Sequence, residues 1–372
     1  MSKLFKYAFS DLYDISSGIS STKDQAGHGT PFASFRTVFN NIFLPDKLPD
    51  LMEVSEKEQK IYSIKKGDIL ITRTSETVDE LAMSCVALKD YPQATYSGFV
   101  KRLRPKTEGI VYDRFMAFFL RSKYFRKVIE CNTIMTLRAS FNEDIFSFLD
   151  LYLPDYETQK RIGDLLYHME RKRENNAQIN DNLQQMAHMT FMHCFWGKPT
   201  NGAIGEILIE HEKSPIQVGQ AKNTVGSYPF FTSGDAVLRW KSSLIDGRNI
   251  FMNTGGNAGV KFHVGKAAYS TDTWCVSARD GLSDYLYLFL DSIKPELSQK
   301  FFQGTGLKHL QKPILKNRPM YIPSKDELEV FNHSVIPWLT LVSDNIRESE
   351  RLAALRDWLL PMLMNGQATI ED

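Results

Sequence analysis

The chain has 372 residues, of which 42% are hydrophobic and 24% charged, with a formal net charge of +1. This length allows two or more globular domains, and so small a net charge neither favours nor excludes a polyanionic partner. The four cysteines form no CxxC pair, which is typical of free thiols in a reducing compartment. Since no signal-peptide core or membrane-length apolar run is found, we expect a cytoplasmic protein.

The first segment, residues 1–153, reads as a mixed block of strands and helices. Runs rich in β-formers and bounded by Gly, Pro and Asp predict strands within KKGDILITRTSE (65–76) and SCVALKDYPQATYSGFVKRLRP (84–105). Residues 113–130 predict an amphipathic helix with a basic face. Polar residues then occupy the turn Arg73-Thr74-Ser75 and the loop TLRASFN (136–142).

The second segment, residues 154–196, predicts one long helix that begins at Pro154. Its apolar residues recur at spacings of three and four, as on one face of a helix that packs on a partner. Asn176 interrupts this stripe. The stripe consists of Ile162, Leu165, Met169, Ile179, Leu183 and Met186.

The third segment, residues 197–323, repeats the pattern of the first. Strands are predicted within DGRNIFMNTGGNAGVKF (246–262) and GKAAYSTDTWCVSARDG (265–281), and a helix in DYLYLFLDSI (284–293). A polar turn at 253–257 and a basic loop, GTGLKHLQKP (304–313), follow the order seen in the first block. Lys308 lies 170 residues after Arg138.

The fourth segment, residues 324–372, predicts a second long helix that begins after Pro323. Its stripe consists of Phe331, Trp338, Leu341, Leu352, Leu355 and Leu359, with Asn345 as a polar interruption. Antiparallel pairing with the first helix at a constant residue sum of about 524 sets Asn176 opposite Glu348 and Ile179 opposite Asn345. Buried polar groups at matching depth fix register. Pro337 and Pro361 are expected to kink or break this helix.

A shift of 169 residues superimposes the second half of the chain on the first, including Pro154 on Pro323 and Asn176 on Asn345. We therefore expect an α+β fold with two globular α/β domains, separated by two long helices that form an antiparallel coiled coil with pseudo-twofold symmetry. A helix of about 40 residues is ~60 Å long. The alternative is two unrelated core helices of globular domains.

The surplus positive charge lies in the two blocks. Residues 1–153 carry 21 Lys and Arg against 19 Asp and Glu, and residues 197–323 carry 15 against 10, whereas both helical segments are net negative. Such sorting favours blocks that face phosphates, although polar turn residues are often simply turns. The candidate DNA contacts are Arg36, Arg73, Thr74, Ser75, Lys101, Arg102, Arg138, Ser140, Asn253, Thr254, Asn257, Lys261, Thr271, Lys308 and His309.

Sequence signatures of catalysis are missing. The chain has no GxxxxGK[ST] phosphate loop, GxSxG elbow or HExxH motif. TGGNAG (254–259) has the wrong spacing for GxGxxG and reads as a tight turn. His188, His193 and Cys194 read as packing residues because no second cluster of metal ligands accompanies them. We expect no catalytic or metal site.

The ordered set of motifs resembles the specificity (S) subunits of type I restriction–modification systems. The resemblance spans nearly the whole chain and is carried by GDILITR (67–73), YSGFVKRLRP (96–105), LYLPDYETQKRIGDLL (151–166), YPFFTSGD (228–235), AAYSTDTWCV (267–276) and RLAALRDWLLPMLMNG (351–366). The family often has Glu-x-Gln after the proline of each helix. Glu157 and Gln159 match that pattern, whereas Asp326-Glu327-Leu328 depart from it.

This resemblance implies target-recognition domain 1 at 1–153, spacer helix 1 at 154–196, target-recognition domain 2 at 197–323 and spacer helix 2 at 324–372. Each domain of such a subunit reads one half of a split, asymmetric DNA site, and the helices set the spacer. The subunit is not an enzyme and binds no cofactor itself. It recruits two methyltransferase subunits, which use S-adenosylmethionine, and restriction subunits, which use ATP and Mg. The competing hypothesis is a two-headed coiled-coil adaptor that binds proteins and not DNA.

Overall fold

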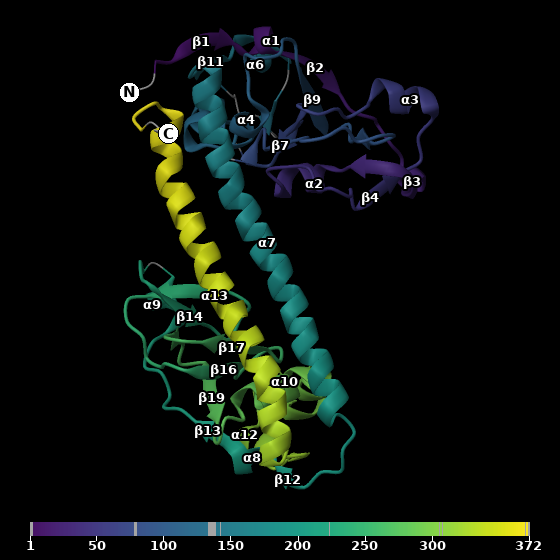
Figure 1. Ribbon diagram of the computed structural model, residues 1–372. Helices are drawn as coiled ribbons and strands as arrows, with labels where there is room; N and C mark the ends of the chain where they lie inside the picture. The colour runs from purple at the N-terminus through teal and green to yellow at the C-terminus, as the bar shows by residue number, and fades with distance from the viewer. Residues whose placement is uncertain are drawn as a thin grey trace. The chain divides into compact units, whose positions relative to one another are not determined.

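The computed structural model describes residues 3–77, 80–132, 139–141, 143–222, 224–304, 306, 308–368 and 370. The chain forms two compact units. Unit 1 comprises residues 1–172 and 351–372, and unit 2 comprises residues 173–350. Two 40-residue helices, α7 (Tyr156–Phe195) and α13 (Lys325–Met364), are each divided between the two units (Figure 1). No helix in the described part of the chain is both long and apolar enough to cross a membrane.

Unit 1 contains a four-stranded antiparallel sheet, β2-β9-β5-β7, and a three-stranded sheet, β4-β3-β8, in which β3 and β8 run parallel. Two strand pairs, β1-β11 and β6-β10, complete it. Its elements are β1 (Phe5–Ala8), α1 (Phe9–Leu12), β2 (Tyr13–Ser17), a 3-10 turn (Lys23–Gln25), β3 (Ala26–Ala33), α2 (Phe35–Asn40), β4 (Asp50–Met52), α3 (Glu56–Ile61), β5 (Ile69–Thr72), β6 (Thr74–Ser75), β7 (Ser84–Val86), β8 (Thr95–Tyr96), β9 (Val100–Pro105), α4 (Asp113–Phe119), α5 (Lys123–Asn132), β10 (Ala139–Ser140), α6 (Glu143–Phe148) and β11 (Asp150–Leu153).

Unit 2 repeats the two larger sheets strand for strand. Its four-stranded antiparallel sheet has the order β13-β19-β16-β17, and its three-stranded sheet, β15-β14-β18, again has one parallel pair. The pair β12-β22 corresponds to β1-β11. The elements are β12 (Gly202–Ala203), α8 (Ile204–Ile207), β13 (Leu208–Glu210), α9 (Val218–Ala221), β14 (Tyr228–Phe231), β15 (Val237–Trp240), β16 (Arg248–Asn253), β17 (Val260–Val264), β18 (Ala268–Tyr269), β19 (Thr273–Ala278), α10 (Ser283–Ser292), α11 (Lys294–Glu296), a π-helical turn (Leu297–Phe301), β20 (Phe302–Gln303), β21 (His309–Leu310), α12 (Lys312–Lys316) and β22 (Pro319–Met320).

Both long helices begin with a side-chain cap at the same position of the repeat. The Asp155 carboxylate accepts hydrogen bonds from the backbone N of Thr158 at 2.9 Å and from its hydroxyl at 2.8 Å. The Ser324 hydroxyl accepts from the backbone N of Glu327 at 3.4 Å, and the Glu327 carboxylate accepts from the backbone N of Ser324 at 2.8 Å. Such caps satisfy the free amides of the first turn. The repeated architecture predicted from the sequence is thus confirmed.

The core of each unit includes side chains from both long helices. In unit 1, Ile162 and Leu166 of α7 and Leu363 of α13 pack with α4 and α5. Contact between α7 and α4 is so close that a Cβ on Gly163 would lie 2.6 Å from the backbone N of Phe115. In unit 2, the core is formed by Ala187, Phe191 and Phe195 of α7, by Leu328, Phe331, Val335 and Leu339 of α13, and by α10.

The sequence predicted that Pro337 and Pro361 kink or break the second helix, and the predicted break is wrong. α13 stays helical through both prolines. On either side of Pro337, Val335 and Leu339 are buried, at 0% and 2% exposure. Burial of each such side chain contributes about 1.5–3 kcal/mol, so their packing outweighs a proline penalty of about 3 kcal/mol.

The helix pair is antiparallel within each unit. In unit 2, Asn176 Nδ2 donates to Glu348 Oε2 at 2.8 Å, as the sequence predicted, and Asn345 Nδ2 donates to Asn180 Oδ1 at 2.9 Å, where Ile179 was the expected partner. In unit 1, Arg356 Nη1 lies 2.8 Å from Glu170 Oε2.

The predicted seam is partly misplaced. Ile162, Met169, Asn176, Phe331 and Asn345 are buried, and Leu165, Leu183, Trp338, Leu352 and Leu359 are half-buried. Ile179, Met186, Leu341 and Leu355 are each more than 40% exposed, so the prediction that they belong to the buried seam is wrong. The buried stripe instead uses Leu166, Asn180, Ala187, Val335 and Val342. A straight helix with 3.6 residues per turn drifts away from a strict seven-residue pattern.

Candidate nucleic-acid interface

In unit 1 the structure joins the two polar segments that the sequence separated by about sixty residues. β6 pairs with β10, which sets Thr74 opposite Ser140 and Ser75 opposite Ala139. The backbone N of Phe141 donates to the carbonyl of Arg73 at 2.8 Å. This junction carries the exposed side chain of Arg73, while Arg138 lies outside the described residues.

Unit 2 contains the same junction with different side chains. The backbone N of Gly256 donates to the carbonyl of Lys308 at 2.9 Å, and that of Leu310 donates to the carbonyl of Thr254 at 3.0 Å. Lys308, His309 and Asn257 are all exposed there. Each unit therefore presents one paired polar junction, and exposed basic side chains occur on both.

Two candidate cations of unit 1 are engaged within the fold. Lys101 is 5% exposed, and its Nζ lies 3.0 Å from Glu143 Oε1. Arg102 donates through Nη1 to the carbonyl of Ser63 at 2.7 Å, with its guanidinium 5.6 Å from the ring centre of Tyr96. Lys101 thus anchors α6, and Arg102 anchors the chain that follows α3. Arg36 on α2 is exposed.

Four candidates in unit 2 also have structural contacts. Asn253 is 6% exposed and donates through Nδ2 to the carbonyl of Asn257 at 3.0 Å. The Thr254 hydroxyl donates to the carbonyl of Asp272 at 2.7 Å. Lys261 Nζ donates to the carbonyl of Thr232 at 2.9 Å and to that of Gly234, and burial lowers its pKa. Thr271 is half-buried.

Burial and hydrogen bonding remove Lys101, Asn253 and Lys261 from the set of freely presented side chains. The sequence placed Lys101 and Lys261 correctly in strands and placed Asn253 in a turn, whereas the structure makes Asn253 the last residue of β16. The sequence could not show whether each side chain points outward, because a shift of one residue along a strand reverses its face.

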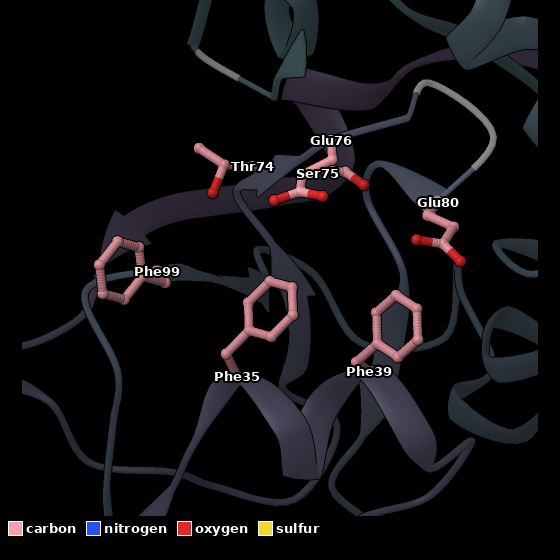
Figure 2. A pocket seen from close by; sticks show the side chains of 7 residues that line it. All are labelled: Phe35, Phe39, Thr74, Ser75, Glu76, Glu80 and Phe99. Carbon is pink, nitrogen blue, oxygen red and sulfur yellow. The ribbon is translucent and has the colours of Figure 1, made fainter. Parts of the chain in front are cut away.

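Sequence reasoning also missed an aromatic pocket beside the junction of unit 1. The pocket has a volume of about 390 Å³ and is lined by Phe35, Phe39, Thr74, Ser75, Glu76, Glu80 and Phe99 (Figure 2). Only Thr74 and Ser75 were candidates. One available signal was Phe99, an apolar residue directly after the Ser97-Gly98 turn, which is 63% exposed.

The most strongly perturbed surface carboxylates belong to ion pairs. Burial alone would raise the pKa of Glu210, but hydrogen bonds from Lys312 and Lys316, both at 2.7 Å, lower it to about 2. A hydrogen bond from Lys198 is the main cause that lowers the pKa of Glu327 to about 2. Across the described ranges, no three His, Cys, Asp or Glu side chains group closely enough to hold a metal ion.

The chain is similar in sequence to two known specificity subunits. The "Type I restriction enzyme HindI specificity subunit" of Haemophilus influenzae is 30% identical over 189 residues, which are 50% of this chain but only 39% of that subunit. The "Type I restriction enzyme MjaIX specificity subunit" of Methanocaldococcus jannaschii is 21% identical over 369 residues, covering 87% of this chain and 82% of the relative.

The fold is also similar to a solved structure. The crystal structure of a type I restriction-modification system S subunit from M. genitalium aligns with a TM-score of 0.71 at 13% identity, over 97% of this chain and 96% of that one. The family model described as "Type I restriction modification DNA specificity domain" matches residues 6–185 and 196–334. Since these two stretches make up well over half of the chain, the protein belongs to the type I restriction-modification DNA specificity domain family.

Proposed function

We propose that the chain is the sequence-specific DNA-binding subunit of a type I restriction–modification complex. Unit 1 reads one half of a bipartite, asymmetric site, unit 2 reads the other half, and α7 and α13 set the spacer. The observation that carries this proposal is the paired polar junction, which recurs at the same place in both units but with different side chains. A repeated scaffold with different loops suits two different half-sites.

Exposed cations at the junctions suit the phosphate backbone. Arg73 in unit 1 and Lys308 in unit 2 are exposed next to hydroxyl and amide side chains. Lys and Arg contacts to phosphates supply affinity that falls with salt, whereas side chains that reach base edges supply sequence preference. Half-sites on one face of a duplex lie about one turn, ~34–36 Å, apart.

Two methyltransferase subunits and restriction subunits are the proposed protein partners, in the cytoplasm. Large apolar side chains are exposed on the long helices, among them Met189, Val330 and Trp358 at 69%, 76% and 65% exposure. We propose that the partner subunits cover these side chains. The chain itself is non-catalytic in this proposal, and the partners carry S-adenosylmethionine, ATP and Mg.

Selection from random duplex DNA with the chain in complex with its methyltransferase partner tests the proposal. We expect enrichment of two short sequences separated by a fixed gap, with affinity that declines as salt rises. A complex that enriches no bipartite sequence contradicts the proposal and favours the two-headed adaptor.

A further inference from the structure

The aromatic pocket of unit 1 is built by segments far apart in the sequence. Phe35 and Phe39 come from α2, Thr74 and Ser75 from β6, and Phe99 from the turn between β8 and β9. Figure 2 shows both α2 rings pointing toward Thr74, Ser75, Glu76 and Glu80. The volume of about 390 Å³ lies within the roughly 300–1,000 Å³ that ligand pockets occupy.

The apolar wall of the pocket suits a flat ring. The rings of Phe35 and Phe39 are stacked, with centres 5.8 Å apart and planes 19° apart. Phe99 is 63% exposed, and its backbone is held at both ends. Its N donates to Ser97 Oγ at 3.2 Å, and its carbonyl accepts from the N of Arg73 at 2.8 Å. Covering an exposed phenyl ring with a partner surface is favourable, because it removes apolar area from water.

The polar wall of the pocket selects the charge and hydrogen bonding of the occupant. It consists of the carboxylates of Glu76 and Glu80 and the hydroxyls of Thr74 and Ser75. No Lys or Arg is among the described lining residues. Carboxylates only accept hydrogen bonds, and they repel phosphate. The occupant must therefore combine a flat apolar face with N–H donors.

We propose that this pocket takes a nucleobase that has left the DNA stack and carries an exocyclic amino group. The ring lies against Phe35, Phe39 and Phe99, and the amino group donates to Glu76 or Glu80. Unstacked bases are bound in this way, between aromatic side chains and hydrogen-bonding groups. Thymine is the only DNA base without an exocyclic amino group and offers the carboxylates only its N3–H, so the pocket binds it more weakly than the other bases. This inference rests on the proposed function, because it assigns one base of the half-site that unit 1 reads.

The position of the pocket supports a DNA base as its occupant, rather than a flat organic cation. Arg73 precedes Thr74 directly, and its exposed side chain lies on the paired junction next to the pocket. If Arg73 binds a backbone phosphate, the DNA strand lies beside the opening of the pocket. A base must leave the stack to reach the pocket, because the rings of Phe35 and Phe39 are half-buried within it.

The test uses the chain in complex with its methyltransferase partner on its selected bipartite site. 2-Aminopurine, whose fluorescence rises on unstacking, replaces one base at a time in the half-site. Apart from any target base that the methyltransferase subunit itself flips, we expect one position to brighten on binding of the wild-type complex. Phe99→Ala, and Phe35→Ala combined with Phe99→Ala, should abolish that rise and weaken binding roughly 5- to 150-fold. Phe148→Ala is the matched control, since Phe148 is 78% exposed outside the pocket.

A second pair of variants tests the amino group. Thymine at the same position should weaken binding by the wild-type complex roughly 5- to 150-fold. With Glu76→Gln and Glu80→Gln combined, that discrimination should shrink, because an amide can donate as well as accept. Glu130→Gln, an exposed glutamate on α5, is the control.

The outcomes separate this inference from the proposed function. If a bipartite site is selected but no position other than a methyltransferase target brightens, or the brightening at that other position survives Phe99→Ala, the pocket inference is wrong while the function stands. If the variants leave DNA selection intact and weaken binding of the methyltransferase subunit, the pocket docks protein instead. If the wild-type complex selects no bipartite site, the proposed function itself fails. Phe99→Ala alone decides the question if the double variant does not fold.

Discussion

Asn345 of α13 donates a hydrogen bond to Asn180 of α7 at 2.9 Å, and both side chains are less than 10% exposed. One turn away, Asn176 donates to Glu348 at 2.8 Å. These bonds form a polar layer between two helices whose other buried residues are mainly apolar. A slip of either helix by one turn would bury these amides without partners, so the layer sets the register.

We expect Asn180→Leu alone to destabilise unit 2 by about 1–3 kcal/mol, because it leaves the Asn345 amide buried without this partner. Leucine at both positions should recover most of that loss, since neither polar group then remains. Urea denaturation of the three proteins measures the difference. Asn182→Leu, at an exposed position of α7, should stay within about 0.5 kcal/mol of wild type. A double variant as unstable as the single one would show that the pairing is not the cause.

Arg73 and Lys101 provide a matched test of the DNA-binding surface. Arg73 is exposed, whereas Lys101 is 5% exposed and paired with Glu143. Arg73→Ala should reduce the slope of log affinity against log salt by about 1, without loss of stability. Lys101→Met should lower stability and leave that slope unchanged when measured on folded protein. The reverse pattern would contradict this division of roles.

The scaffold was largely predictable because its signals are local. The prolines before the long helices, Pro154 and Pro323, the helical periodicity and the β-rich strand runs are each read within a short stretch of sequence. The residues buried between α7 and α13 were harder to predict, because large side chains such as Ile179 and Met186 are exposed while Ala187 is buried. Hydrophobicity alone does not show which neighbour a side chain meets.

The aromatic pocket was not predictable for a different reason. Phe35 and Phe99 are 64 positions apart and meet only when β3 pairs in parallel with β8 and the turn after β8 reaches α2. The junctions were partly predictable, since each of their two loops is polar, but their pairing is a long-range contact that no local pattern encodes.

The stability of unit 2 should fall in mild acid because of His263. The side chain is 3% exposed, and burial, followed by the charge of Arg347, lowers its pKa to about 4. The neighbouring charges are those of Arg347, Arg239 and Asp246. In the unfolded chain, His263 takes up a proton near the ordinary histidine pKa of about 6.5. In the folded unit it takes up that proton only when the pH falls to about 4. Stability due to His263 is therefore complete above about 6.5 and is lost as pH falls toward 4.

Denaturation at several pH values measures this loss. Between about pH 6.5 and 4, wild type should lose roughly 3 kcal/mol more than His263→Leu. His309→Leu, at an exposed position of β21, is the control and should follow wild type. Equal pH profiles for wild type and His263→Leu would show that the buried imidazole is not the titrating group.

Shortening both long helices tests their role as a spacer. Residues 175–181 of α7 lie opposite residues 343–349 of α13, because Asn176 bonds to Glu348 and Asn180 bonds to Asn345. Removing both segments shortens the pair by about 10 Å, which should reduce the preferred gap between half-sites by roughly three base pairs. Selection from random DNA with the methyltransferase partner gives the gap directly. An unchanged gap would be incompatible with helices that set the spacing.

The division of the long helices between the units also sets an order of events during synthesis. Unit 2 is one continuous stretch, residues 173–350, whereas the core of unit 1 needs Leu363 and Met364 from α13. Domains generally complete their folding from the N-terminus as the ribosome releases them. Here the unit that is translated first is completed last, so its apolar core waits for the end of α13 to emerge.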